Sequence, residues 1–98
     1  MQPRQVRMFT TETGVDFSTN EARGHTVMEL VAADRPGLLS SIGRTFVDLG
    51  IDIETAKIMT IGERAEDVFY ITDESGAPLD TETRQDLRAA LLKRLSQH

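Results

Sequence analysis

The chain has no cysteine among its 98 residues and only two histidines, His25 and His98. Without cysteine, neither a disulfide framework nor a CxxC metal or redox site is possible. The scarcity of histidine excludes His-rich metal sites and argues against catalysis by a serine and histidine pair. We therefore expect no metal site, no resident cofactor and no catalytic residue in this chain.

Positive charge and long apolar runs are scarce as well. Sixteen acidic residues outnumber 11 basic ones, which gives a formal net charge of −5, so the chain lacks the positive field that supplies most non-specific affinity for nucleic acid. No apolar run approaches the roughly 20 residues needed to span a membrane, and residues 1–20 lack a signal-peptide core. We expect no nucleic-acid partner, no membrane association and a cytoplasmic location.

Side-chain alternation and β-branched residues predict the strands. Arg4–Thr10 suits a short first strand, and the polar run Thr11–Gly24 is interpreted as a loop. Thr26–Ala32 carries apolar residues on both faces, which is typical of a central strand. The run Ile51–Ile61 predicts one long strand with a bulge near Thr55, where the phase of the apolar residues changes.

Two segments have the spacing of amphipathic helices. The first runs from Leu38 to Gly50, with Pro36 suited to its first turn and Gly50 to the left-handed position that closes it. Asp34 precedes this helix, where its carboxylate would accept backbone N–H bonds or complement the positive end of the helix dipole. Asp80 is predicted to cap the second helix. The apolar stripe of that helix consists of Leu87, Leu91 and Leu95.

The order of these elements predicts an α+β fold. A right-handed crossover from Thr26–Ala32 to Ile51–Ile61 leaves room for one strand between them. Asp67–Thr72, reached by a hairpin turn at residues 62–65, is the natural occupant. The first strand then pairs antiparallel with the central strand on its other side. The result is a ββαββα, four-stranded antiparallel sheet with two helices on one face, a permuted ferredoxin-like layout. Residues 1–24 complete the sheet, and residues 25–98 form the core of the domain.

The segment between the central strand and the first helix is the candidate ligand site. Free N–H groups at a helix start bind anionic or zwitterionic ligands, so an amino acid could place its carboxylate there and its ammonium beside Asp34. If the edge strands of two chains pair across a twofold axis, Asp52 of one chain would face Asp34 of the other. The candidate ligand-binding residues are Asp34, Arg35, Pro36, Gly37, Leu38, Leu39, Gly50, Ile51, Asp52 and Ile53.

Each of these residues also has a purely structural interpretation. Asp34 would serve only as a helix cap, Asp52 as a solvated edge charge and Arg35 as a surface residue. The acidic residues between positions 63 and 74, Asp67 among them, match no calcium loop and are interpreted as a solvated rim. His25, at the start of a strand, is predicted to lie at the surface.

The run Asp-Arg-Pro-Gly-Leu-Leu at 34–39, with the following helix and Gly-Ile-Asp-Ile at 50–53, resembles the ACT domain family of small-molecule regulatory modules. The resemblance covers about residues 25 to 96. Residues 56–73, with Gly-Glu-Arg at 62–64 and Asp-Val-Phe-Tyr at 67–70, are more narrowly similar to the C-terminal ACT domains of bifunctional uridylyltransferase/uridylyl-removing enzymes. Some serine-binding relatives carry a histidine where this chain has Ala32, so their side-chain recognition is not transferred.

This resemblance implies a regulatory rather than catalytic role. The chain would be a piece of a larger nucleotidyltransferase and phosphohydrolase, and it would sense an amino acid, with glutamine favoured, at the interface with another ACT domain in cis or in a homodimer. It would meet the nitrogen-regulatory PII protein only through the parent enzyme. Two alternatives remain open. The first is a structural ACT pairing module, or an ACT-repeat amino-acid-binding protein, with no small ligand of its own in the isolated domain. The second, less favoured, is a small ferredoxin-like enzyme such as an acylphosphatase.

Overall fold

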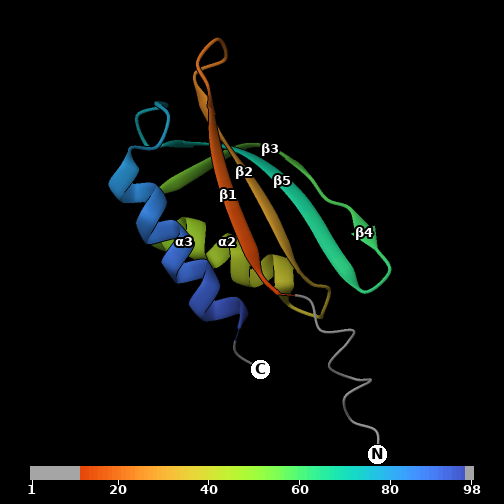
Figure 1. Ribbon diagram of the computed structural model, residues 1–98. Helices are drawn as coiled ribbons and strands as arrows, with labels where there is room; N and C mark the ends of the chain where they lie inside the picture. Colours follow the sequence, from red (N-terminus) through yellow and green to blue (C-terminus); the bar gives the residue numbers. More distant parts are fainter. Residues whose placement is uncertain (1–11, 97–98) are drawn as a thin grey trace, which may run out of the picture.

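The computed structural model describes residues 12–96, which form one antiparallel sheet and two helices (Figure 1). The sheet follows the order β1-β2-β5-β3, and a short strand, β4, also pairs with β5. In chain order the elements are β1 (Gly14–Asn20), β2 (His25–Ala33), α2 (Leu38–Asp48), β3 (Ile51–Lys57), β4 (Thr60–Ile61), β5 (Arg64–Asp73) and α3 (Thr81–Leu95).

The predicted α+β topology is confirmed. β2 is a central strand, with β1 antiparallel on one side and β5 antiparallel on the other. β5 occupies the place between β2 and β3 that the crossover left open. Both helices lie on one face of the sheet (Figure 1), which is the ferredoxin-like arrangement. Their apolar stripes therefore meet the alternate residues of the strands that point the same way.

The first strand does not lie where the sequence suggested. The prediction for Arg4–Thr10 lies outside the described residues. The interpretation of Thr11–Gly24 as a loop is wrong for residues 14–20, which form β1, whereas residues 21–24 are a turn. β1 is an edge strand whose outward face is polar, which hides the alternation. Its inward face carries Val15, which is buried, and Phe17, which packs against the core.

The long strand predicted at Ile51–Ile61 is divided into β3 and β4. The predicted bulge is confirmed by a register shift between Ile53 and Thr55. The interruption falls after Lys57, where the backbone N–H of Met59 donates to Oδ1 of Asp67 at 3.1 Å. A side chain of β5 thus takes the N–H that strand pairing would otherwise use, and the sheet has five strands instead of four.

The first helix begins later than the sequence suggested. Gly37 is its N-cap residue, in the left-handed region at φ 83°, and no side chain caps the helix. The predictions that Asp34 caps it and that Pro36 lies in its first turn are therefore wrong. The cause is the strand before it, since β2 continues to Ala33 and the Asp34 N–H donates to the Glu63 carbonyl at 2.9 Å. The left-handed closing position of Gly50, at φ 68°, is confirmed.

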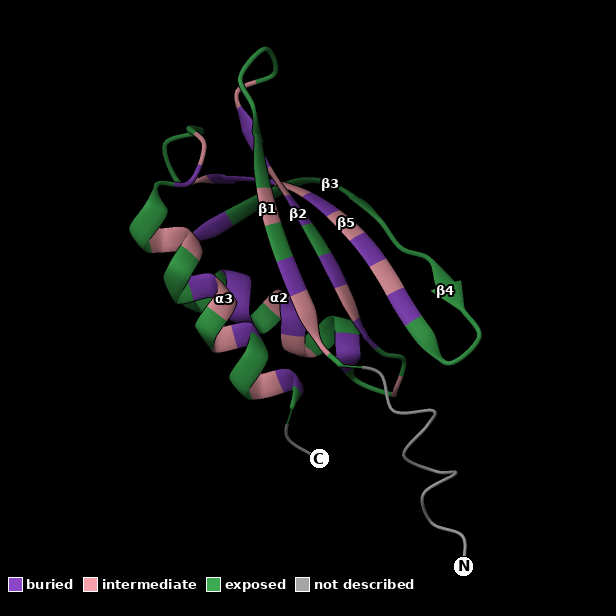
Figure 2. Cartoon of the chain, viewed as in Figure 1, coloured by how far each residue is buried: buried purple, intermediate pink, exposed green. Residues whose placement is uncertain are grey.

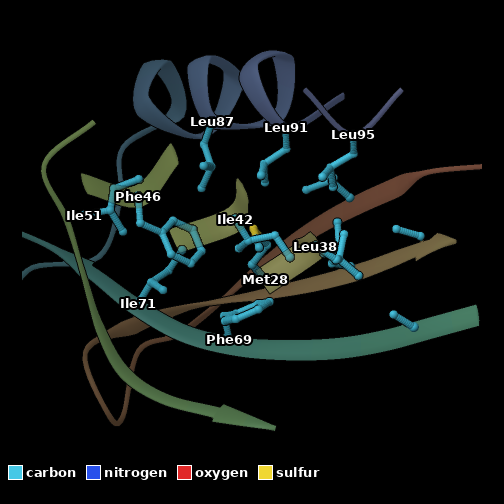
Figure 3. Close-up of a cluster of buried hydrophobic side chains, with 14 of the residues drawn as sticks. Met28, Leu38, Ile42, Phe46, Ile51, Phe69, Ile71, Leu87, Leu91 and Leu95 are labelled. Carbon is cyan, nitrogen blue, oxygen red and sulfur yellow. The ribbon is translucent and has the colours of Figure 1, made fainter. Parts of the chain in front are cut away.

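The second helix matches its prediction closely. Oδ1 of Asp80 accepts a hydrogen bond from the Thr83 N–H at 2.8 Å and caps α3. Figure 3 shows the predicted stripe of Leu87, Leu91 and Leu95 pointing from α3 into the core, toward residues of α2 and the sheet. The rings of Phe46 and Phe69 meet edge to face there, with centroids 5.4 Å apart. This core fixes α2 against the sheet and so positions the loop that leads into it.

Candidate functional site

The loop between β2 and α2 borders a hollow of about 290 Å³. Its walls come from three parts of the fold: the loop and first turn of α2, the segment around β4, and the start of β5. The size lies at the lower end of the range for ligand pockets, which suits a small molecule. The residues around it are Asp34, Arg35, Gly37, Leu38, Leu39, Ser40, Ile58, Thr60, Ala65 and Asp67.

Backbone N–H groups at the start of α2 are free to bind an anion. The Leu38 N–H donates to the Arg35 carbonyl at 3.2 Å, and the Ser41 N–H donates to the Gly37 carbonyl at 3.0 Å. Between them, the N–H groups of Leu39 and Ser40 have no hydrogen-bond acceptor among residues 12–96. They lie at the positive end of the helix dipole and at the wall of the hollow, where a carboxylate is stabilised by both effects.

Asp67 supplies a buried carboxylate on the other side of the hollow. Its exposed fraction is 1%. Oδ1 accepts the hydrogen bond from Met59, whereas Oδ2 is buried and has no partner within the described part of the chain. Burial raises the pKa of Asp67, the Met59 N–H opposes that rise, and the negative charge of Asp34 adds to it.

The interpretation of Asp67 as part of a solvated rim is therefore wrong. On β5 it follows the alternation of Ala65, Phe69 and Ile71, which are all buried beneath the helices. That alternation was visible in the sequence, because the apolar residues occupy the same odd positions. A carboxylate on the apolar face of a central strand is the signal that identifies this residue.

The charged residues of the loop behave differently from each other. Asp34 is exposed, and its side chain makes no hydrogen bond within residues 12–96, so its carboxylate remains open to a ligand. Arg35 is half-buried, and its Nη2 donates to the Arg94 carbonyl in the last turn of α3 at 3.5 Å. Arg35 thus contacts the C-terminal end of α3, which leaves the loop without a dedicated side-chain anchor for an anion.

The second predicted segment, Gly50–Ile53, lies at the other end of α2. The helix has 11 residues, which at a rise of 1.5 Å per residue separates the two segments by about 16 Å. Gly50 and Ile51 border another hollow, together with Asp73 and Thr83, and Asp52 is exposed. One chain therefore does not bring Asp52 to Asp34. Their meeting requires a second domain, as the twofold hypothesis assumes.

The outer edge of β3 and β4 carries an exposed apolar surface, which we call the edge surface. β3 has no strand partner on this side within the described residues, and Figure 2 shows most of β3 and all of β4 as exposed. A free strand edge with apolar side chains favours pairing with another sheet. The edge surface consists of Ile53, Ile58, Met59 and Ile61, which are 45% to 54% exposed.

A third hollow, of about 580 Å³, lies on the face of the sheet away from the helices. Glu54 lies at the bulge in β3 and reaches this face, where its Oε1 lies 2.8 Å from Nδ1 of His25. His25 is 6% exposed and packs against the ring of Tyr70, with centroids 5.0 Å apart. The prediction that His25 lies at the surface is therefore wrong, because the Glu54 side chain and the Tyr70 ring cover it.

The described residues offer neither a metal cluster nor a membrane-spanning helix. Within residues 12–96 no three or more acidic or histidine side chains are grouped so that they could hold a metal ion. No helix in this part of the chain has both the length and the apolar character needed to cross a membrane.

Comparison with known proteins places this geometry in context. The chain is 49% identical over 94 residues to the bifunctional uridylyltransferase/uridylyl-removing enzyme of Vibrio campbellii, 48% identical over 96 residues to that of Pseudomonas aeruginosa and 44% identical over 95 residues to that of Vibrio cholerae. These alignments cover 96% to 97% of this chain but 11% of each relative. The family model of the ACT domain matches residues 26–89, from β2 into α3 and including the whole hollow at the start of α2. The chain belongs to the ACT domain family.

Proposed function

We propose that this chain is an amino-acid-sensing regulatory domain of a uridylyltransferase/uridylyl-removing enzyme, and that glutamine is its ligand. Relatives that carry this enzyme name align with nearly the whole chain at 44% to 49% identity, while the chain spans about 11% of their length. Catalysis would then reside in other parts of the parent enzyme, and PII would be met only through them. Within the chain, no described feature argues for chemistry of its own.

The observation that carries the proposal is the hollow at the start of α2. It combines two free backbone donors, at Leu39 and Ser40, with acidic side chains nearby. A free amino acid carries a carboxylate and an ammonium group on one carbon, so it needs a donor pair and an acid close together. The ACT family match, over residues 26–89, spans this whole hollow, and the hollow offers both kinds of partner.

The strength of binding expected from this site is modest. Millimolar binding requires about −4 kcal/mol, and two or three charge-assisted hydrogen bonds of ~1.5 to 3 kcal/mol each would supply it after ordering costs. Weak and reversible binding suits a sensor of a metabolite. The ligand would shift an existing equilibrium between two pairings of ACT domains, and only a difference in affinity between the pairings drives that shift.

The test is an amide-shift titration of the chain with glutamine, with glutamate and serine as controls. We expect shifts that saturate in the millimolar range and cluster at residues 34–40, with a second cluster at residues 50–53 if two domains share the ligand. A dimer verified in the same sample and lacking any response would rule out amino-acid binding by this chain. Equal responses to all three compounds would remove the preference for glutamine.

A second candidate function is a pairing module that binds no small ligand. The edge surface favours it, because exposed apolar residues next to a free strand edge are suited to association. Met59→Lys would place a charge there and should lower self-association in sedimentation velocity. Val47→Lys is the control, since Val47 is 77% exposed but lies on α2. If pairing is the whole function, Met59→Lys should abolish regulation in the parent enzyme and glutamine should shift no amide of the chain.

A further inference from the structure

We propose that Asp67 is the specificity residue of the hollow, and that its Oδ2 receives the ammonium group of the ligand. The site would then accept α-amino acids and reject carboxylic acids of the same length that lack the amino group. This inference rests on the proposed function, and it names an acceptor other than Asp34, the residue that the loop sequence favoured.

The hollow has two poles of opposite sign. The positive pole is the start of α2, with the unbonded N–H groups of Leu39 and Ser40. The negative pole contains Asp67 and Asp34, which are close enough for Asp34 to raise the pKa of Asp67. A zwitterion aligned between the poles satisfies both, whereas a simple anion satisfies the first and is repelled by the second.

Oδ2 of Asp67 is an unusual atom, because it is buried and has no hydrogen-bond partner among the described residues. Buried polar atoms are nearly always hydrogen-bonded, and an unpaired one is unfavourable. Here the unpaired atom belongs to a residue that is only 1% exposed and that lines a hollow. A ligand ammonium group that reaches Oδ2 would supply the missing partner in a site already shielded from water, where a charge-assisted bond is strong.

The other oxygen of Asp67 is held in place by the backbone. Oδ1 accepts the Met59 N–H at 3.1 Å, and the Glu66 N–H donates to the Met59 carbonyl at 2.9 Å. The segment between β3 and β4 thus fixes the position of the carboxylate. An acceptor fixed in this way loses little freedom when a ligand binds, which favours selective recognition.

The charges around the hollow determine how binding should depend on pH. Among its lining residues, Asp34, Arg35 and Asp67 are titratable, and Arg35 is turned toward the end of α3. An ammonium group favours the ionised form of Asp67, whose pKa burial has raised. Amino-acid affinity should therefore increase as the pH rises through that raised pKa, and binding at acidic pH should release a proton.

The first experiment varies the ligand and leaves the chain unchanged. Glutamine and glutaramate, which is glutamine without its α-amino group, are titrated into the wild-type chain at pH 7 while residues 34–40 are followed by NMR. We expect glutaramate to bind at least about 10-fold more weakly, the least that loss of one charge-assisted bond implies. If glutaramate and glutamine bind with equal affinity and shift the same residues, the role of Asp67 is contradicted, but the proposed function is not. No response to glutamine contradicts the proposed function, and the inference with it.

The second experiment varies the residue. Asp67→Asn keeps an oxygen for the Met59 N–H but replaces the ammonium acceptor with an amide donor. We expect at least a 10-fold loss of glutamine affinity, a smaller preference for glutamine over glutaramate, and no proton release in calorimetry at acidic pH. Asp86→Asn is the matched control, because Asp86 is exposed on α3. A folded Asp67→Asn chain that still prefers glutamine to the same degree would overturn the inference.

Discussion

Asp67→Asn should also make the stability of the ligand-free chain less dependent on pH. The wild-type carboxylate is buried at 1% exposure with one oxygen unpaired, and burial raises its pKa above the usual value. The folded chain therefore holds the proton of Asp67 more tightly than the unfolded chain does. Between the unfolded pKa, about 3.9, and the raised folded pKa, the free energy of unfolding falls as the pH rises.

The size of the effect follows from linkage. Each unit by which the folded pKa exceeds the unfolded one lowers stability at neutral pH by about 1.4 kcal/mol relative to stability below pH 4. Asparagine does not titrate, yet it preserves an acceptor for Met59. We therefore expect the variant to equal or exceed the wild type in stability at pH 7. That advantage should shrink as the pH falls through the raised folded pKa toward the unfolded pKa of about 3.9, and it should vanish only below it, where Asp67 is protonated in both states.

Urea denaturation of both proteins at several pH values between 4 and 7.5 measures this difference directly. The quantity of interest is the stability of the variant minus that of the wild type, because all other titrating groups are shared and largely cancel. A difference that grows with pH supports the reasoning. A difference independent of pH, or one that shrinks as the pH rises, would show that Asp67 is not held in a desolvated state and would refute it.

Two further predictions concern the scaffold. Asp80→Ala should lower the free energy of unfolding by about 1 kcal/mol, because the Thr83 N–H loses its acceptor; the same denaturation assay checks it against Asp86→Ala, whose effect should stay within about 0.5 kcal/mol. Leu91→Ala should cost about 2 to 5 kcal/mol, because Leu91 is fully buried between α3 and the sheet, and a loss below 1 kcal/mol would contradict the packing in Figure 3.

The sequence predicted the elements whose apolar pattern follows directly from burial. α3 buries one stripe of leucines and β2 carries apolar residues on both faces, and both predictions are confirmed. β1 was missed because its polar outward face dominates its composition and only Val15 and Phe17 reveal its inward face. Residues 14–20 are extended because they pair with β2, and such a contact between two segments cannot be seen in the local sequence.

Only the part of the candidate site that has a local sequence signal was predicted. The loop at residues 34–39 could be found because glycine, proline and a following helix give a local signal. Ile58 reaches the hollow beside Asp67 through the connection that leads into β4, which pairs with β5, and the break after Lys57 coincides with the hydrogen bond from the Met59 N–H to the Asp67 side chain, eight residues away. Such contacts between strands carry no local signature. Asp67 itself was marked in the sequence only by its place in the alternation of β5, and its acidic neighbours masked that signal.

The position of Ile58 joins the proposed ligand site to the edge surface. Its side chain is 50% exposed at the edge and also lines the hollow that contains Asp67. Next to it, Met59 contributes both its N–H to Asp67 and its exposed side chain to the edge surface. A ligand that binds Asp67 would therefore act on the same two residues that a second domain would cover. Coupling between two binding events is reciprocal. A partner domain that restrains residues 58 and 59 would therefore change the affinity for the ligand, and the ligand would change the affinity for the partner by the same factor. Under the proposed function, this shared segment is a direct physical route from amino-acid binding to a change in how ACT domains associate.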